Sequence, residues 1–258
     1  MINVASIQMK VDDNGKEANV MKANRLIDES EAADLILLPE MWSVGYFAFS
    51  SYKQESESLE GPTISMLRDK ARQKGCFIFG GSIVESTENG LYNTSVLIDR
   101  SGSIIARYRK IHLYGHQSEE TKLLKRGTEI CVVKCEIGTF GLSTCYDLRF
   151  PELYRKMAVM GAEIFLVASA WPFPRLEAWL MLNRVRALEN QVFLIASNCT
   201  GTNRNKGLVG HSMIVDPWGT PIATGGDEEC IVRAEIDIKK VYEAREFLSA
   251  FTDRVLID

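Results

Sequence analysis

The chain has 258 residues, of which 46% are hydrophobic and 25% are charged, and its formal net charge is −4. This composition excludes the intrinsically disordered class, which combines few apolar residues with a large net charge. The acidic balance argues against a general nucleic-acid binder, and no apolar run approaches the ~20 residues of a membrane-spanning helix. We expect one domain over residues 1–258, because no Pro/Gly/Ser-rich linker divides the chain.

Strand-like runs alternate with amphipathic helical stretches, which is the pattern of an α/β protein. A strand over 1–9 precedes a helix over 16–33, and the apolar run 34–38 predicts a buried strand. Pro62 suits the first turn of a helix that ends near Lys74. Further strands are expected at 76–85, 91–99, 104–108, 130–137, 140–144, 164–169, 192–197, 212–216 and 230–236, and further helices at 151–160 and 175–190.

Two segments of the chain resemble each other. Residues 33–42 and 162–171 both carry an acidic residue, a buried-strand pattern and a final tryptophan, Trp42 or Trp171. Chance is one explanation, since buried strands share their composition. The other is that the chain has two similar halves, for example two sheets packed face to face with helices outside.

The start of the chain and the cysteines indicate the compartment. The first residues lack the basic start and the small-residue cleavage site of a secretory signal. The six cysteines are scattered, and a chain of this length builds a core without disulfides. We therefore expect a cytoplasmic protein.

Two pairs of residues could form a zinc site. His112 and His116 are four apart, as are Cys131 and Cys135. However, residues 131–137 alternate in the manner of a strand that turns its cysteines to the apolar face, where a free cysteine behaves as a small hydrophobic residue. The chain also lacks the phosphate-loop and dinucleotide-binding motifs. We expect neither a metal nor a cofactor.

Cys145 is the candidate nucleophile. It follows the apolar run 140–144 and precedes a helix that begins at Pro151, so its side chain would project from a rigid strand end. Backbone N–H groups at a helix start favour a thiolate. The alternative is a packed, unreactive cysteine.

Glu40 and Lys110 complete a possible site. Glu40 directly follows the buried strand, where a partly buried carboxylate can act as a general base, and Lys110 is a cation in apolar surroundings. Both residue types are also common at solvated strand ends. Together with Cys145 they supply the nucleophile, base and cation that amide hydrolysis needs. A Cys–His hydrolase using His112 or His211 is a weaker alternative.

Three segments resemble the nitrilase superfamily of carbon–nitrogen hydrolases: 37–42, 108–113 and 145–152, in the same order and spacing over essentially the whole chain. The resemblance implies a Glu40–Lys110–Cys145 triad and a four-layer α-β-β-α sandwich, extended across a homodimer. It also implies a supporting role for Glu120, seven residues before Gly127, although Glu119 lies beside it.

Residues 170–175, 186–190 and 210–219 are most similar to the omega-amidase branch, and the last also resembles amidases of deaminated glutathione. The branch implies hydrolysis of a small dicarboxylic monoamide such as 2-oxoglutaramate, through a thioester, with the N–H of Tyr146 and Lys110 holding the oxyanion. Val209 departs from the tyrosine common there. Other amidases, a nitrilase and a catalytically silent binding protein are the alternatives.

Arg149 and Trp171 are the candidate substrate-binding residues. Arg149 follows Cys145 by four residues, and its guanidinium could bind a substrate carboxylate through two parallel hydrogen bonds. The alternative is an ion pair with Asp147 or Glu152. Trp171 is expected to line the same pocket and to limit substrate length.

Overall fold

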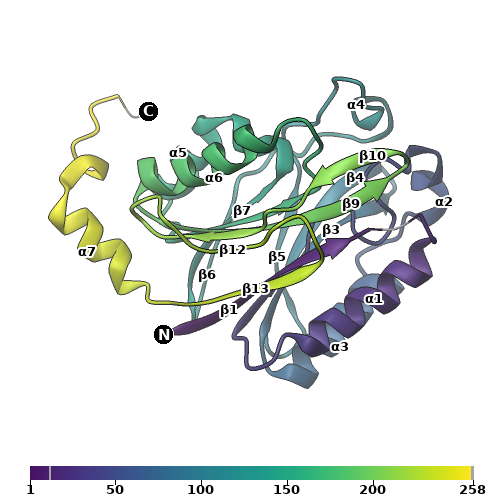
Figure 1. Cartoon of the computed structure of the whole chain (residues 1–258), viewed down its shortest axis with the longest axis horizontal. Coiled ribbons are helices and arrows are strands. Elements are labelled where there is room, and N and C mark those ends of the chain that lie inside the picture. The colour runs from purple at the N-terminus through teal and green to yellow at the C-terminus, as the bar shows by residue number, and fades with distance from the viewer. Residues whose placement is uncertain (12, 257–258) are drawn as a thin grey trace.

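In the computed structural model, which describes residues 1–11 and 13–256, the strands form one hydrogen-bonded sheet that folds into two halves lying face to face (Figure 1). These halves are called the first and the second sheet below. The strands are β1 (Ile2–Lys10), β2 (Leu35–Leu37), β3 (Phe77–Thr87), β4 (Gly90–Ile98), β5 (Ile104–Arg109), β6 (Cys131–Cys135), β7 (Gly138–Thr144), β8 (Ile164–Ser169), β9 (Phe193–Asn203), β10 (Lys206–Val209), β11 (Met213–Val215), β12 (Pro221–Thr224) and β13 (Cys230–Ile236). The α-helices are α1 (Lys16–Glu29), α2 (Tyr52–Glu55), α3 (Pro62–Lys74), α4 (Glu120–Leu123), α5 (Pro151–Val159), α6 (Leu176–Asn190) and α7 (Lys239–Phe247). Short 3₁₀ helices are η1 (Phe49–Ser51), η2 (Cys145–Arg149) and η3 (Ser249–Phe251).

The two sheets repeat one topology. In the first, β1, β2 and β3 are parallel and β4 and β5 follow antiparallel. In the second, β7, β8 and β9 are parallel and β11 and β12 follow antiparallel. The two similar sequence segments fall on β2 and β8, the second strand of each set, so the prediction of two similar halves is confirmed. The sheets are joined where Met9 of β1 pairs with Cys199 of β9.

Side-chain alternation on the strands produces four layers. Leu35 and Leu37 of β2 point into the layer between the sheets, whereas Ile36 packs outward beneath α1 and α3. In the second sheet Leu166 points inward and Phe165 packs outward beneath α5. A strand buried on both faces has no polar side, which explains the continuous apolar runs in the sequence. The expected α-β-β-α sandwich is confirmed.

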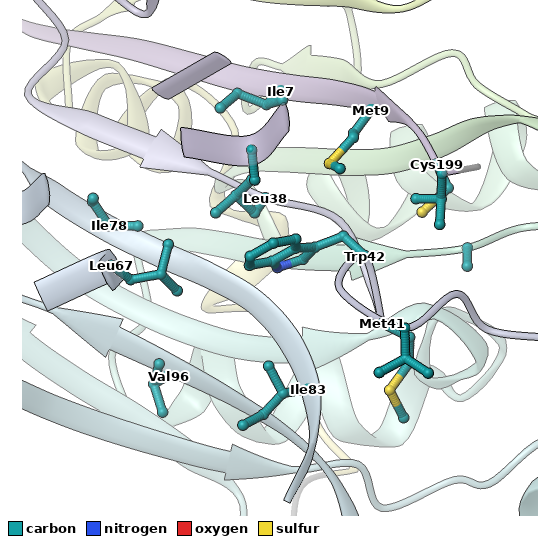
Figure 2. Packing of buried hydrophobic residues seen from close by; sticks show 14 of the residues in the cluster. Ile7, Met9, Leu38, Met41, Trp42, Leu67, Ile78, Ile83, Val96 and Cys199 are labelled. Atoms are coloured by element: carbon teal, nitrogen blue, oxygen red, sulfur yellow. The ribbon is translucent and has the colours of Figure 1, made fainter. Parts of the chain in front are cut away.

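The core beneath α1 and α3 holds the chain segment that follows β2. Figure 2 shows the ring of Trp42 among Leu38, Leu67 and Ile83, and the indole N–H donates to the carbonyl oxygen of Gly80 at 2.9 Å. Gly81 has φ +64°, and a Cβ there would lie 2.0 Å from the carbonyl oxygen of Pro39. This close packing fixes the backbone on both sides of residue 40.

Some element boundaries differ from the sequence predictions. The first helix ends at Glu29 rather than residue 33, because the backbone leaves the helical region at Ser30, where ψ is 68°, and becomes left-handed at Ala32, where φ is +51°. β9 continues to Asn203 rather than residue 197, because β10 pairs with its far end. The predictions also missed α7, a largely polar helix in which Val241 and Ala244 are the buried residues. Within the described ranges, no helix is long and apolar enough to cross a membrane.

Candidate active site

Four separate elements bring the candidate residues together. Glu40 follows β2, Lys110 follows β5, and Cys145 follows β7, while Glu120 begins the short helix α4. A direct backbone bond joins the ends of β2 and β8, because the N–H of Glu40 donates to the carbonyl oxygen of Ser169 at 3.3 Å. The face-to-face packing of the sheets thus brings residues that are distant in sequence together in one cluster.

The ammonium group of Lys110 lies between two carboxylates. Its Nζ donates to Glu40 Oε1 at 2.8 Å and to the two carboxylate oxygens of Glu120 at 3.0 and 3.1 Å. All three side chains are completely buried. Glu119 is exposed and pairs with Lys122, so Glu120 is the glutamate of this cluster.

Glu40 is held at both carboxylate oxygens. Besides Lys110, its Oε1 accepts from Asn93 Nδ2 at 2.8 Å, and its Oε2 accepts from the backbone N–H of Ala170 at 3.0 Å. Burial raises the pKa of Glu40, the charge of Lys110 lowers it, and the charge of Glu120 raises it; the net effect is a raised pKa. A carboxylate with a raised pKa is a stronger base than one in water.

The lysine stays protonated. Burial by itself lowers the pKa of Lys110, but the attraction of Glu120 and Glu40 outweighs it, and the pKa lies above its ordinary value. The cluster therefore keeps a permanent positive charge next to the base.

Cys145 occupies a sharp turn between β7 and η2. It is 7% exposed, and its φ of +47° places a non-glycine residue in the left-handed region, a conformation that costs about 1 kcal/mol or more. The turn is fixed by a reciprocal cap, in which the side chains of Thr144 and Asp147 bond each other's backbone N–H groups. Strain of this kind is common at functional sites.

The Cys145 thiol is neutral at rest. Burial raises its pKa, the charge of Glu40 raises it further, and Lys110 lowers it, leaving the pKa above the ordinary value of a thiol. The sequence prediction that the helix start favours a thiolate is wrong, because burial and a neighbouring carboxylate outweigh the helix N–H groups. The thiol contacts the Glu40 carboxylate, and this contact lowers the pKa of Glu40. A base for the thiol proton is thus in place.

Neither candidate histidine has a hydrogen bond with Cys145 among the described residues. His112 Nδ1 lies 2.7 Å from Asp147 Oδ1, and its ring stacks on Phe150. His211 Nε2 lies 3.0 Å from Asp227 Oδ1. These partners give both histidines structural roles.

A pocket opens above Cys145. Arg149 and Trp171 both line it, and the guanidinium carbon of Arg149 lies 5.1 Å from the centre of a Trp171 ring. Arg149 makes no ion pair with Asp147, whose carboxylate bonds Tyr108 and His112 instead. The remaining lining residues are Tyr46, Tyr114, Tyr146, Ala170, Pro172 and Arg175.

Sequence reasoning missed several residues of the cluster and the pocket. Asn93 and Tyr46 bond the buried carboxylates, and Arg175 lines the pocket over the ring of Tyr114. One signal was available, because residues 93–95 are three consecutive polar residues within a predicted strand. Val209, which departs from the related branch, is buried in the core beneath α5 and α6 and is not among the lining residues.

The zinc alternative finds no support in the geometry. Cys131 and Cys135 pack against the core between the sheets, as the strand pattern predicted. In the part of the chain that the structure describes, no three His, Cys, Asp or Glu side chains are placed to hold a metal.

Comparison with known proteins assigns the family. The family model described as carbon–nitrogen hydrolase matches residues 3–246. This chain belongs to that family. It is a hydrolase that acts on carbon–nitrogen bonds other than peptide bonds.

Individual relatives cover nearly the whole chain. A 2-oxoglutaramate amidase of Bacillus subtilis is 38% identical, over 97% of this chain and 96% of its own length. A 2-oxoglutaramate amidase of Paenarthrobacter nicotinovorans is 37% identical, over 98% of this chain and 89% of its own length. A solved amidase of Nesterenkonia sp. AN1, in which acrylamide has added to the active-site cysteine, is 25% identical with a TM-score of 0.85, over 96% of this chain and 98% of that one.

Replacing Lys110 with an uncharged residue should lower the stability of the fold, because the two buried carboxylates lose their cation. In Lys110→Met, Glu40 and Glu120 face each other without a cation, and breaking a buried ion pair costs about 3–5 kcal/mol. We expect the free energy of unfolding in urea to fall by about 3 kcal/mol at pH 7. The loss should be smaller at pH 5, because a carboxylate whose folded pKa is raised destabilises the fold only once it is ionised.

The double variant Lys110→Met/Glu120→Gln is the control, since it removes one of the two facing charges. It should recover part of the lost stability at pH 7. A loss that is the same at both pH values and in both variants would contradict this account of the cluster.

Proposed function

We propose that this chain hydrolyses the terminal amide of a small dicarboxylic monoamide, with Cys145 as nucleophile, Glu40 as base and Lys110 as the oxyanion-binding cation. The observation that carries the proposal is a neutral, strained cysteine at the pocket floor, in contact with a buried carboxylate that a protonated lysine holds in place. Such an arrangement supplies every group that acyl transfer from an amide requires.

The first half-reaction forms a thioester. Glu40 accepts the thiol proton as the sulfur of Cys145 attacks the amide carbon. Lys110 and the backbone N–H of Tyr146, in the first turn of η2, stabilise the negative charge that forms on the amide oxygen. Glu40 then passes the proton to the amide nitrogen, the C–N bond breaks, and ammonia leaves.

The second half-reaction releases the acid. Glu40 takes a proton from a water molecule, which attacks the thioester carbon. When the C–S bond breaks, the sulfur takes the proton back from Glu40, and the carboxylic acid leaves. The net reaction consumes one water and returns Glu40 and Cys145 to their starting states. Glu120 keeps Lys110 in place through two oxygens.

The residues that line the pocket favour binding of an anionic substrate of limited size. Arg149 and Arg175 place two guanidinium groups around the opening, each over an aromatic ring, and Trp171 forms part of the wall. A guanidinium binds a carboxylate with two parallel hydrogen bonds. Together with the two relatives that act on 2-oxoglutaramate, this favours a 2-oxo-acid monoamide of that kind as the substrate.

The free thiols support a reducing compartment. All six cysteines are unpaired, three of them buried, which suits a protein that stays in the cytoplasm. The cytoplasmic location stays a prediction.

The nucleophile can be tested directly. We expect Cys145→Ala to fold and to release no ammonia from 2-oxoglutaramate, and wild type quenched during turnover to carry an acyl adduct on Cys145 by mass spectrometry. Cys76→Ala is the control, because Cys76 is also buried but lies directly before β3, in the core beneath α1 and α3. Activity in Cys145→Ala, with the adduct on another cysteine, would overturn the assignment.

If Arg149 binds the substrate carboxylate, replacing it should weaken the binding of carboxylate-bearing amides more than that of uncharged amides. Arg149→Lys keeps the charge but loses the two-pronged geometry, and a hydrogen bond to a charged group is worth about 1.5–3 kcal/mol. We expect KM for 2-oxoglutaramate to rise at least about tenfold, and KM for an uncharged amide of equal length to change less than about twofold. Arg155→Lys, outside the pocket, should change neither; equal losses on both substrates would reduce the proposal to a small aliphatic amide.

We further propose a homodimer that forms through α6. Met181, Val185 and Leu188 are exposed on one face of this helix. Trp218, in the turn next to Leu188, and Phe247 of α7 extend the patch, with their rings 5.7 Å apart. Contiguous exposed apolar surface of this kind marks an interface. A second copy bound here would extend the layers of the sandwich.

Sedimentation velocity tests the interface. Wild type should sediment as a dimer, and Leu188→Glu should sediment as a monomer, since it places a charge in an apolar contact. Met21→Glu, at an exposed apolar residue on α1 at the opposite outer face, should remain a dimer. A monomeric wild type, or identical behaviour of both variants, would exclude this dimer.

A further inference from the structure

Asn93 occupies the centre of the buried charge cluster. It lies on β4, is completely buried, and its backbone carbonyl oxygen accepts from the backbone N–H of Lys110 at 2.9 Å. Its Nδ2 donates to Glu40 Oε1 at 2.8 Å and to Glu120 Oε1 at 3.1 Å. One neutral amide therefore bonds both carboxylates that hold the lysine.

The amide and the lysine share the same acceptor atoms. Glu40 Oε1 and Glu120 Oε1 each accept one bond from Lys110 Nζ and one from Asn93 Nδ2. At rest, the contacts of Lys110 Nζ with the two glutamates account for the three N–H groups that an ammonium has. Lys110 must turn an N–H away from one carboxylate if it is to bond an oxyanion.

We propose that Asn93 is a positioning residue that makes this release possible. This role rests on the proposed function. Asn93 keeps the Oε1 atoms of both glutamates hydrogen-bonded when Lys110 redirects an N–H to the oxyanion. A buried carboxylate oxygen left without a donor would cost the full desolvation of that group, so the amide lowers the barrier to the redirection.

The amide also selects the basic oxygen of Glu40. Each carboxylate oxygen offers about two lone-pair positions. Lys110 and Asn93 fill both positions of Oε1, whereas the backbone N–H of Ala170 fills one position of Oε2. The free position on Oε2 receives the proton of Cys145 and later the proton of water.

An amide suits this place better than a charged side chain. An aspartate would add a third carboxylate to the two already buried, and a second lysine would compete with Lys110 for the substrate oxygen. The Asn93 donors are neutral and do not titrate, so they stay in place while Glu40 gains and loses its proton.

The test compares two buried asparagines. Asn93→Leu removes the donors at similar volume, and Asn183→Leu does the same on α6, where Asn183 is equally buried and donates to the carbonyl oxygen of Trp179. For Asn93→Leu we expect kcat for 2-oxoglutaramate to fall at least about tenfold, with KM within about twofold. The acid limb of kcat/KM should move up by about one pH unit, because a lost hydrogen bond to the charged form raises the pKa of Glu40.

Asn183→Leu should keep the wild-type kcat and pH profile whatever its effect on stability. If Asn93→Leu does not fold, Asn93→Ala removes the same donors without adding volume and is measured instead. A wild-type acid limb in the Asn93 variant, or an equal loss in both variants, would overturn the proposal.

Alkylation of Cys145 by iodoacetamide separates this inference from the substrate assignment. Its rate also depends on proton transfer to Glu40 and needs no turnover. An upward shift of its acid limb in the Asn93 variant supports the positioning role even if 2-oxoglutaramate is not hydrolysed. An unshifted alkylation profile overturns the role even if the substrate assignment holds.

Discussion

A protonated lysine sealed between two carboxylates is the constraint on which the site depends. Lys110, Glu40 and Glu120 are all completely buried, and three buried charges are tolerated only with close contacts and further hydrogen bonds. The structure supplies these from Asn93, from Tyr46 and from the backbone N–H groups of Ala170 and Tyr114. Rigid packing is therefore a requirement of the chemistry, because any opening to water would weaken each of these interactions.

The same electrostatics define the resting state of the nucleophile. Burial and the charge of Glu40 keep the Cys145 thiol protonated, so the sulfur becomes reactive only when Glu40 takes its proton. Burial also raises the pKa of Glu40, which makes this carboxylate a stronger base for the thiol proton. This coupling distinguishes the site from a cysteine hydrolase that stores a thiolate beside a histidine.

The repeated topology of the two sheets explains why the site lies where it does. β2 and β8 hold equivalent places in their sheets, and the chain leaving each strand contacts the other through Glu40 and Ser169. The first of these segments delivers the base, and the second delivers the pocket wall at Trp171. The hydrophobic core around Trp42 then fixes the backbone beside the base (Figure 2).

The sequence by itself determined the elements and the chemical identity of the site. Apolar runs such as 34–38 and 164–169 predict buried strands because both faces of those strands are covered. The positions of Glu40, Lys110 and Cys145 at strand ends made them candidates, and the resemblance to the nitrilase superfamily selected them as a triad. Only the tertiary structure decided that Glu120 rather than Glu119 meets the lysine, that Asn93 joins the two carboxylates, and that the thiol is neutral. These facts depend on burial and on distances between residues far apart in the chain, which local residue patterns do not encode.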